Sequence, residues 1–323
     1  DGIEITWDNI IGESELQITG FQLIKINGSN IIDTLNLYSF TTFYKDKEGL
    51  IWNNTYTYKL SAVLETQDEI YFSDEQTIEV TRRITVGVDS LDLNIDYFSI
   101  NNVLDDIDKF YESNPDSMEV VFNVYVQEGT YFENIEIKTP VKLMCDDGHE
   151  CIIDGNNNQV INIEEVGSIS LDTSNVLISD FKIQNGGGTN NGGGLYIYGA
   201  SPKLVYCDFI NNNAESNGGG VYLEDSSPFF ENCTFNNNTA KYKGGGGYLE
   251  NSDAEFINCT FSSNKASGEG LVDNDGGALY IENQGATGIS VKNCIFDSND
   301  AELGPAIYIE NSNDILIKKS LFF

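Results

Sequence analysis

Apolar and polar residues alternate in short segments that recur along the last two-thirds of the chain. One such segment is Val221-Tyr222-Leu223-Glu224, and two more follow it at 228–231 and 233–236. The tyrosine of this segment recurs at intervals of 26, 26, 32 and 28 residues, at Tyr196, Tyr222, Tyr248, Tyr280 and Tyr308. Alternation with a period of two predicts β-strands. A repeat of this length predicts a solenoid whose units stack on a shared core.

Each repeat is predicted to form one coil of a parallel β-helix with three short strands. Phe230 and Cys233 are both expected to point inward, yet they are three residues apart, so the chain must turn a corner at Glu231-Asn232. Equivalent residues on successive coils should lie about 4.8 Å apart and form interior columns. The predicted columns are Phe209, Phe235, Phe261 and Phe296, and Cys207, Cys233, Cys259 and Cys294.

The first part of the chain is predicted to form a separate all-β unit over residues 1–82. Four alternating segments there, at 3–7, 21–26, 55–63 and 76–80, are separated by Gly, Asn and Asp turns. Residues 83–117 are predicted to be a linker that contains an amphipathic helix starting after Ser99. Such a helix would cap the core of the β-helix, which is assigned to residues 118–323.

These segments resemble two known families. The pattern Gly-Gly-Gly-[Val/Leu/Ile]-Tyr followed by Cys-x-Phe-x-x-Asn-x-Ala resembles the repeat of polymorphic outer-membrane-protein-type β-helices, and residues 118–323 resemble the pectin-lyase-like right-handed β-helix superfamily. Residues 1–82 resemble a fibronectin type III domain, with Tyr56 as its tyrosine corner and Trp7 in its core. The family's first strand is missing, so either the natural chain extends upstream or a neighbour donates a strand.

The resemblances imply an all-β chain: a fibronectin type III-like sandwich followed by a helix-capped right-handed parallel β-helix. They imply no single function, because the superfamily includes adhesins, passenger domains, structural proteins and polysaccharide lyases.

The charge of the chain restricts its partners. It contains 17 Lys and Arg against 51 Asp and Glu, a net charge of −34. Such a charge repels nucleic acid and anionic lipid and suits cations or a basic partner. No apolar run has membrane-spanning length, so we expect neither nucleic-acid binding nor membrane insertion. The chain starts without Met or a signal peptide, and we expect a piece of a longer extracellular or cell-surface protein.

Two of the six cysteines are predicted to form a disulfide. Cys145 and Cys151 bracket a short polar loop, and a disulfide would form there in an oxidising compartment. Two free thiols are the alternative. Whether the four cysteines of the interior column are paired stays open, because the coil spacing is within disulfide range but parallel side chains are poorly oriented for a bond. A single histidine and the lack of a Cys-x-x-Cys motif argue against a metal site on these cysteines.

A row of glutamates follows the tyrosines by two residues and is expected to face outward. Like charges at coil spacing repel each other, and splaying into water, raised pKa values or bound cations could relieve this. We favour solvated carboxylates without a ligand, with a row of Ca²⁺ ions as the alternative, and expect no other cofactor. The glutamates are Glu224, Glu250, Glu282 and Glu310.

Five Asn-X-Ser/Thr sequences are candidate glycosylation sites: Asn27, Asn53, Asn232, Asn237 and Asn258. We favour Asn27 and Asn53, in predicted loops, and then Asn237. Asn232 and Asn258 share a corner position with Asn293, where stacked amides that hydrogen-bond to each other would compete with glycosylation.

No catalytic residue is predicted. Residues 118–323 contain no arginine, and their lysines do not fall beside an Asp cluster in the linear pattern. We therefore expect a non-enzymatic extracellular structural or adhesive surface protein, in which the β-helix is a rod within a larger adhesin or a head-to-tail filament. Its partners would be further copies joined end to end or further domains of a longer chain. The alternatives are a polysaccharide lyase or hydrolase and an adhesin that binds surface glycans.

Overall fold

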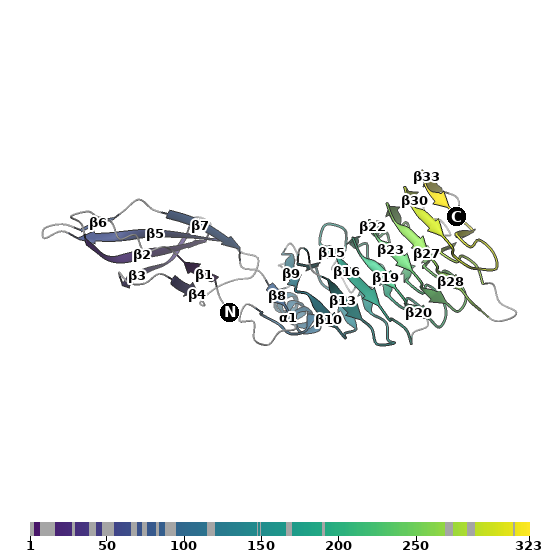
Figure 1. Ribbon diagram of the computed structural model, residues 1–323, viewed down its shortest axis with the longest axis horizontal. Helices are drawn as coiled ribbons and strands as arrows, with labels where there is room; N and C mark the ends of the chain where they lie inside the picture. Colours follow the sequence, from purple (N-terminus) through teal and green to yellow (C-terminus); the bar gives the residue numbers. More distant parts are fainter. Residues whose placement is uncertain are drawn as a thin grey trace. The chain divides into compact units, whose positions relative to one another are not determined.

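The chain folds into two compact units, Asp1–Ile84 with Asp92–Asn94, and Thr85–Leu91 with Ile95–Phe323. The computed structural model shown in Figure 1 describes residues 3–6, 17–27, 30–38, 43–46, 55–65, 70–72, 76–81, 84–87, 95–114, 120–146, 148, 150–165, 170–188, 191–268, 274–282, 288–312 and 314–323.

The first unit contains two antiparallel sheets among its described residues. The larger sheet consists of β2 (Gln17–Asn27), β3 (Asn30–Tyr38), β5 (Thr55–Glu65), β6 (Ile70–Phe72) and β7 (Gln76–Thr81). The smaller sheet pairs β1 (Ile3–Thr6) with β4 (Phe43–Asp46). Leu23 and Tyr58 are buried in the larger sheet. The fibronectin type III sandwich predicted from the sequence is not confirmed by these small sheets, and Trp7 and the side chain of Tyr56 lie outside the described residues.

The second unit is a parallel β-helix with three long sheets (Figure 1). Sheet I contains β8 (Ile84–Val86), β9 (Phe122–Val126), β12 (Val141–Cys145), β15 (Val176–Ser179), β18 (Lys203–Val205), β22 (Phe229–Glu231), β26 (Glu255–Ile257), β30 (Ile289–Lys292) and β33 (Ile315–Lys318). Sheet II contains β10 (Gly129–Tyr131), β13 (Cys151–Asp154), β16 (Phe181–Gln184), β19 (Asp208–Ile210), β23 (Thr234–Asn236), β27 (Thr260–Ser262), β31 (Ile295–Asp297) and β34 (Leu321–Phe322).

Sheet III contains β11 (Ile135–Ile137), β14 (Ile161–Glu164), β17 (Leu195–Tyr198), β21 (Val221–Glu224), β25 (Gly247–Glu250), β29 (Leu279–Glu282) and β32 (Ile307–Glu310). A short fourth sheet joins β20 (Asn213–Ala214), β24 (Thr239–Ala240) and β28 (Lys265–Ala266). One strand lies outside the predicted boundaries: β8, in the segment assigned to the linker, pairs next to β9 in sheet I.

Identical residues of successive coils stack in the interior. Phe235 pairs in register with Phe209 on one side and with Phe261 on the other. Neighbouring rings in this column are parallel, with centroids 4.5 to 5.0 Å apart from Phe209 to Phe322. A second column, Phe230 and Phe256, packs edge-on against the first. In the segment before sheet III, the backbones of successive coils lie too close together for a side chain. A Cβ on Gly219 would lie 2.5 Å from the carbonyl oxygen of Gly245.

The predicted helix is present as α1 (Ile100–Ser113), and Ser99 is its N-cap. The Ser99 side chain accepts a hydrogen bond from the Asn102 N–H, and the Glu133 carboxylate accepts the N–H groups of Ile100 (3.0 Å) and Asn101 (2.8 Å). These bonds satisfy backbone donors that a helix N-terminus leaves unpaired. The buried residues are Ile100, Val103, Leu104, Ile107 and Tyr111.

Phe110 lies at the border of the buried face of α1. It is only half-buried and packs edge-on against Phe122, with ring centroids 5.0 Å apart. Tyr111 is buried instead, because its hydroxyl reaches the carbonyl oxygens of Val120 and Pro140 beneath the helix. None of the described helical segments has the length and hydrophobicity that crossing a bilayer requires.

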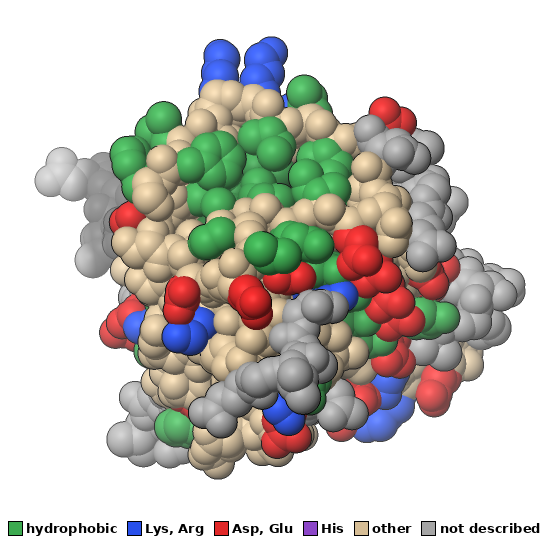
Figure 2. Space-filling model, turned by 90° about the vertical axis from the view of Figure 1, so that its right-hand side faces the viewer, with side chains coloured by type: hydrophobic (Ala, Val, Ile, Leu, Met, Phe, Trp, Pro, Cys, Tyr) green, Lys and Arg blue, Asp and Glu red, His purple; other side chains and the backbone are tan. Residues whose placement is uncertain are grey.

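Hydrophobic side chains gather on the face of the last coils, as Figure 2 shows. The exposed apolar residues of these coils are Leu303, Ile309, Leu316, Ile317, Leu321, Phe322 and Phe323. End-to-end self-association through this face stays a prediction.

Candidate functional site

The tyrosines of the repeat stack on the outer face of sheet III. Tyr222, Tyr248 and Tyr280 are buried, and Tyr196 and Tyr308 pack at the two ends of the stack. Neighbouring ring centroids are 5.0 to 5.5 Å apart. The residues before and after Tyr196, Tyr222 and Tyr280 are fully buried in the core, so the stack is a second packed layer outside the β-helix.

Four of these five tyrosines are each paired with the glutamate of the next coil. The Tyr196 hydroxyl donates to the Glu224 carboxylate at 2.7 Å, and the Tyr248 hydroxyl donates to Glu282 at 2.6 Å. The same bond joins two further pairs, Tyr222 with Glu250 and Tyr280 with Glu310. Burial raises the pKa of the four donor tyrosines, and the nearby carboxylates raise it further. The tyrosines therefore stay protonated and donate.

Lys243 closes one end of this Tyr–Glu ladder. Its Nζ donates to the Tyr280 hydroxyl at 2.6 Å and lies 3.6 Å from Oε2 of Glu310. The hydrogen bond from Tyr280, helped by the positive charge of Lys243, lowers the pKa of Glu310. The repulsion expected along the glutamate row is thus relieved by hydroxyl donors. The signal was present in the sequence, since each glutamate follows a tyrosine by two residues, but the offset of one coil between partners was not considered.

The described residues contain no group of three or more His, Cys, Asp or Glu side chains that could hold a metal ion. The Ca²⁺ row on Glu224, Glu250, Glu282 and Glu310 therefore gains no support from this geometry and stays a prediction.

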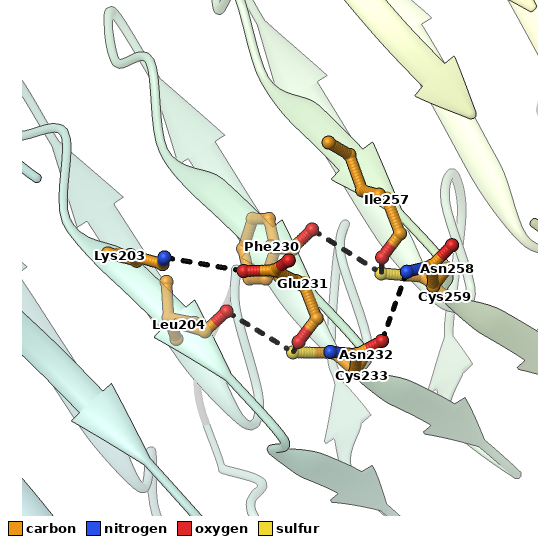
Figure 3. Close-up of polar contacts among 9 residues, drawn as sticks. All are labelled: Lys203, Leu204, Phe230, Glu231, Asn232, Cys233, Ile257, Asn258 and Cys259. Atoms are coloured by element: carbon orange, nitrogen blue, oxygen red, sulfur yellow. Dashed lines mark hydrogen bonds and ion pairs between the residues drawn. The ribbon is translucent and has the colours of Figure 1, made fainter. Parts of the chain in front are cut away.

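The corner between sheets I and II carries an amide ladder. Asn232, Asn258 and Asn293 have φ of 54° to 55°, a left-handed conformation that asparagine tolerates. The Asn258 amide donates to Oδ1 of Asn232 at 3.2 Å (Figure 3). The Asn293 amide donates to Oδ1 of Asn258 at the same distance. The amide of Asn258 is therefore occupied, whereas that of Asn232 has no asparagine before it in the ladder.

A second amide ladder, which the sequence did not reveal, lies inside the β-helix, where Asn212, Asn238 and Asn264 are fully buried. Asn238 Oδ1 accepts from the backbone N–H and the amide of Asn212, and its own amide donates to the Phe209 carbonyl oxygen (2.9 Å) and to Asn264 (3.0 Å). Asn299 continues this ladder. An asparagine two residues before each alanine of the repeat was the available signal.

The other candidate glycosylation sites differ in their surroundings. Asn27 is the last residue of β2, and Asn53 lies outside the described residues. Asn237 is exposed at a left-handed corner, and its amide donates to Oδ1 of Asn211 at 2.6 Å.

The six cysteines form two groups, one disulfide-bonded pair and four free thiols. Cys145 and Cys151 form a disulfide. Cys207, Cys233, Cys259 and Cys294 are free and buried. The Cys233 thiol donates to the Leu204 carbonyl oxygen and the Cys259 thiol to that of Phe230, so each thiol points back toward the preceding coil (Figure 3).

A hollow of about 540 Å³ lies on the surface of sheet I, over β26, β30 and β33. We call it the sheet I hollow. Its charged centre is an ion pair, with the Lys292 Nζ 2.6 Å from Oε1 of Glu255, and Asp314 borders the same space. Its lining residues are Glu255, Gly288, Ile289, Ser290, Lys292, Asp314, Ile315 and Leu316.

A smaller hollow of about 230 Å³ lies at the corner between sheets I and II. We call it the corner hollow. Lys182 and Glu150 face each other in it at 3.7 Å, with Tyr206 on its border. Its lining residues are Glu150, Cys151, Asp180, Phe181, Lys182, Tyr206, Asp208 and Ile210.

Comparison with known proteins identifies the second unit. A family model described as a right-handed β-helix region matches residues 143–323, more than half of the 323 residues. No curated protein sequence matches the chain significantly.

The solved structures that are similar in fold include two pectin methylesterases and an exopolygalacturonase. Pectin methylesterase PemA from Erwinia chrysanthemi has a TM-score of 0.44 at 12% identity, over 68% of each chain. The pectin methylesterase from Aspergillus niger, in deglycosylated form, has a TM-score of 0.38 at 14% identity, over 74% of this chain and 85% of that one. The family 28 exopolygalacturonase from Yersinia enterocolitica has a TM-score of 0.22 at 11% identity, over 99% of this chain and 84% of that one.

The prediction that the chain is not an enzyme is corrected here, because all three similar structures are enzymes. At these identities the similarity concerns the fold alone, so none of their activities is transferred. The prediction rested on the lack of arginine in residues 118–323 and on lysines that do not fall beside an Asp cluster in the linear pattern. Folding brings Lys292 to Glu255 and Asp314, and Lys182 to Glu150 and Asp208, from separate coils.

Proposed function

Because this chain belongs to the right-handed β-helix family, we propose that it is an extracellular carbohydrate-active β-helix that binds a polysaccharide chain in the sheet I hollow. The observation that carries the proposal is the Glu255–Lys292 ion pair (2.6 Å), set beside Asp314 in an open hollow on the face of a parallel sheet.

The lining of this hollow suits a sugar. Glu255 and Asp314 can accept hydrogen bonds from hydroxyl groups, while Lys292 can donate. Ile315 and Leu316 offer apolar surface to the C–H faces of a sugar ring, and half of Leu316 is exposed. A few polar groups on an apolar floor are typical of small-molecule sites. Two carboxylates with an ammonium group are also the kind of groups that can exchange protons with a substrate.

The net charge bears on the type of glycan that would bind, and the disulfide bears on the extracellular location. The net charge of −34 opposes binding of polyuronic acids and favours uncharged or basic glycans. The Cys145–Cys151 disulfide fits an oxidising, extracellular compartment.

The proposal is tested by affinity gel electrophoresis against a panel of neutral, basic and acidic polysaccharides, with release of reducing ends measured in parallel. We expect at least one polysaccharide to retard the wild-type protein and E255Q and D314N to weaken this retardation. The matched control is E231Q, since Glu231 forms an ion pair with Lys203 (3.3 Å) on the same sheet but outside the hollow. Wild-type protein that no polysaccharide retards, or an equal loss in E231Q, contradicts the proposal.

A second candidate function is a stiff surface rod that presents the β-helix within an adhesin. Its support is the columns of stacked phenylalanine, tyrosine and asparagine, which tie the coils from Tyr196 onward to one another. Stacked repeats of this kind make stable elongated scaffolds. Sedimentation at micromolar concentration tests the accompanying prediction of end-to-end assembly, which a concentration-independent monomer contradicts.

A further inference from the structure

Tyr206 occupies the corner between sheets I and II one coil before the amide ladder begins. Asn232, Asn258 and Asn293 fill this position in later coils, whereas the earlier coils place Asp180 and Tyr206 there. Tyr206 has φ of 54°, in the left-handed region. Asparagine adopts this conformation readily, but a bulky aromatic residue rarely does. Strained residues of this kind cluster at ligand-binding sites, so an observed outlier is a reason to look for a function.

Packing does not explain why a tyrosine occupies this position. Its side chain is 59% exposed, and within the described part of the chain its hydroxyl makes no hydrogen bond. An asparagine here could accept a hydrogen bond from the Asn232 amide, as Asn232 does from Asn258. With tyrosine at this position, the amide–amide hydrogen bond to Asn232 cannot form, and an aromatic ring is exposed to solvent.

The ring borders the corner hollow, where charged groups converge from three coils. Lys182 lies on β16, and Asp208 pairs with it in register on β19. Asp180 lies at the corner one coil before Tyr206. Of these groups, Lys182 has an ion-pair partner, Glu150, at 3.7 Å. The carboxylates of Asp180 and Asp208 make no side-chain hydrogen bond to any described residue, and they can accept from a ligand.

We propose that Tyr206, Lys182, Asp180 and Asp208 form a sugar-binding subsite for a neutral hexose unit. The C–H face of the sugar lies on the Tyr206 ring, since an exposed tyrosine offers an apolar face and a polar edge. Its hydroxyl groups donate to Asp180 and Asp208 and accept from Lys182. Three carboxylates against one lysine line the hollow, so a uronic acid unit is excluded by repulsion.

This inference rests on the proposed carbohydrate ligand but on a different site. The corner hollow is built from β13, β16 and β19, and the sheet I hollow from β26, β30 and β33. The two sites share no residue, so they can be disabled separately.

The test is affinity gel electrophoresis and titration calorimetry with neutral hexose polymers and their oligosaccharides, with polygalacturonate as the acidic comparison. The variants are Y206N, which restores the amide of the ladder, and Y206F, which keeps the ring. We expect Y206N to weaken binding of the neutral polymer by about tenfold, as for loss of an aromatic anchor, and Y206F to stay within about twofold of wild type.

Measurements of Tm distinguish a loss of binding from a loss of folding. We expect the Tm of Y206N to equal or exceed that of wild type, because asparagine suits the left-handed corner. Unchanged binding of neutral hexose polymers by Y206N overturns this subsite, and if E255Q still weakens binding, the proposed function stands. Polygalacturonate bound more tightly than neutral polymers also overturns it. If no neutral polymer binds the wild-type protein, both the proposed subsite and the proposed neutral sugar ligand are contradicted.

Discussion

Tyr248 donates its hydroxyl hydrogen to the carboxylate of Glu282, which belongs to the next coil of the β-helix, at 2.6 Å. The two residues therefore join neighbouring coils from outside the core, across sheet III. The same relation recurs between Tyr196 and Glu224. A row of like charges that would destabilise the sheet is thereby converted into a row of hydrogen-bond acceptors, each with its own donor.

Removing one hydroxyl from the Tyr–Glu ladder should destabilise the β-helix without disturbing its stacking. We expect Y248F to lower the free energy of unfolding by about 1 kcal/mol, since the ring remains and one hydrogen bond to a partly exposed carboxylate is lost. Urea denaturation measures this change. In the E282Q background the same substitution should cost less, because the charged acceptor is gone. Equal costs in both backgrounds would show that the two side chains are not coupled.

The buried tyrosines predict a loss of stability at alkaline pH. Burial raises the pKa of Tyr131 to about 12, and its hydroxyl donates to the Gln127 carbonyl oxygen at 2.9 Å. An unfolded tyrosine has a pKa of about 10, so this contribution is fully present below pH 10 and is lost as pH rises toward 12. Thermal melts from pH 8 to 11.5 measure the effect. Y131F should show a shallower alkaline decline than wild type, and a parallel decline contradicts the assignment.

The repeat was predictable from sequence because it depends on residue type at fixed spacing. Phe235 and Cys233 lie inside because the alternation of apolar residues dictates their direction. Side-chain contacts between coils were harder to predict. They join residues 26 to 37 positions apart, and the pattern within one coil does not show which residue of the next coil is the partner. The Tyr248–Glu282 bond and the pairing of Lys292 with Glu255 are of this kind.

The buried amide ladder and the strand pairing of the first unit also depend on contacts between residues that are distant in the sequence. The Asn238 ladder was missed because a fully buried asparagine looks like a turn residue until its partners one coil away are known. The fibronectin type III sandwich predicted for the first unit is not confirmed, and alternation alone does not determine how strands pair.

The buried amide ladder should be more sensitive to substitution than the exposed one. N238A removes the acceptor of the buried Asn212 backbone N–H and one donor to the Phe209 carbonyl oxygen in the interior. We expect a loss of about 2 to 4 kcal/mol, since each buried unsatisfied group is costly. The matched control is N237G at the neighbouring exposed corner, where glycine accepts the positive φ and a change below about 1 kcal/mol is expected. Similar losses in both variants would contradict the distinction.

The column of free cysteines predicts a specific pattern of thiol reactivity. Cys207, Cys233, Cys259 and Cys294 are buried, and burial raises the pKa of the Cys207 and Cys259 thiols, which disfavours the reactive thiolate. Without reductant, a thiol reagent should label almost none in the native protein and four after denaturation, while Cys145 and Cys151 stay unreactive. A count of two or none after denaturation would show that column cysteines are bonded to each other.

The glutamate row provides the last prediction, which concerns Ca²⁺. One carboxylate oxygen of Glu224, Glu250, Glu282 and Glu310 already accepts a tyrosine hydroxyl, and no described group of three acidic side chains converges on one point. Calcium ions prefer six to eight oxygen ligands, so a single row offers too few.

We therefore expect millimolar Ca²⁺ to raise the Tm no more than an equal ionic strength of NaCl, through screening of the net charge of −34. The double variant E250Q/E282Q should respond to Ca²⁺ as wild type does. A Ca²⁺-specific rise in Tm that disappears in E250Q/E282Q would instead establish the cation row, with each ion completing its coordination by water between successive carboxylates.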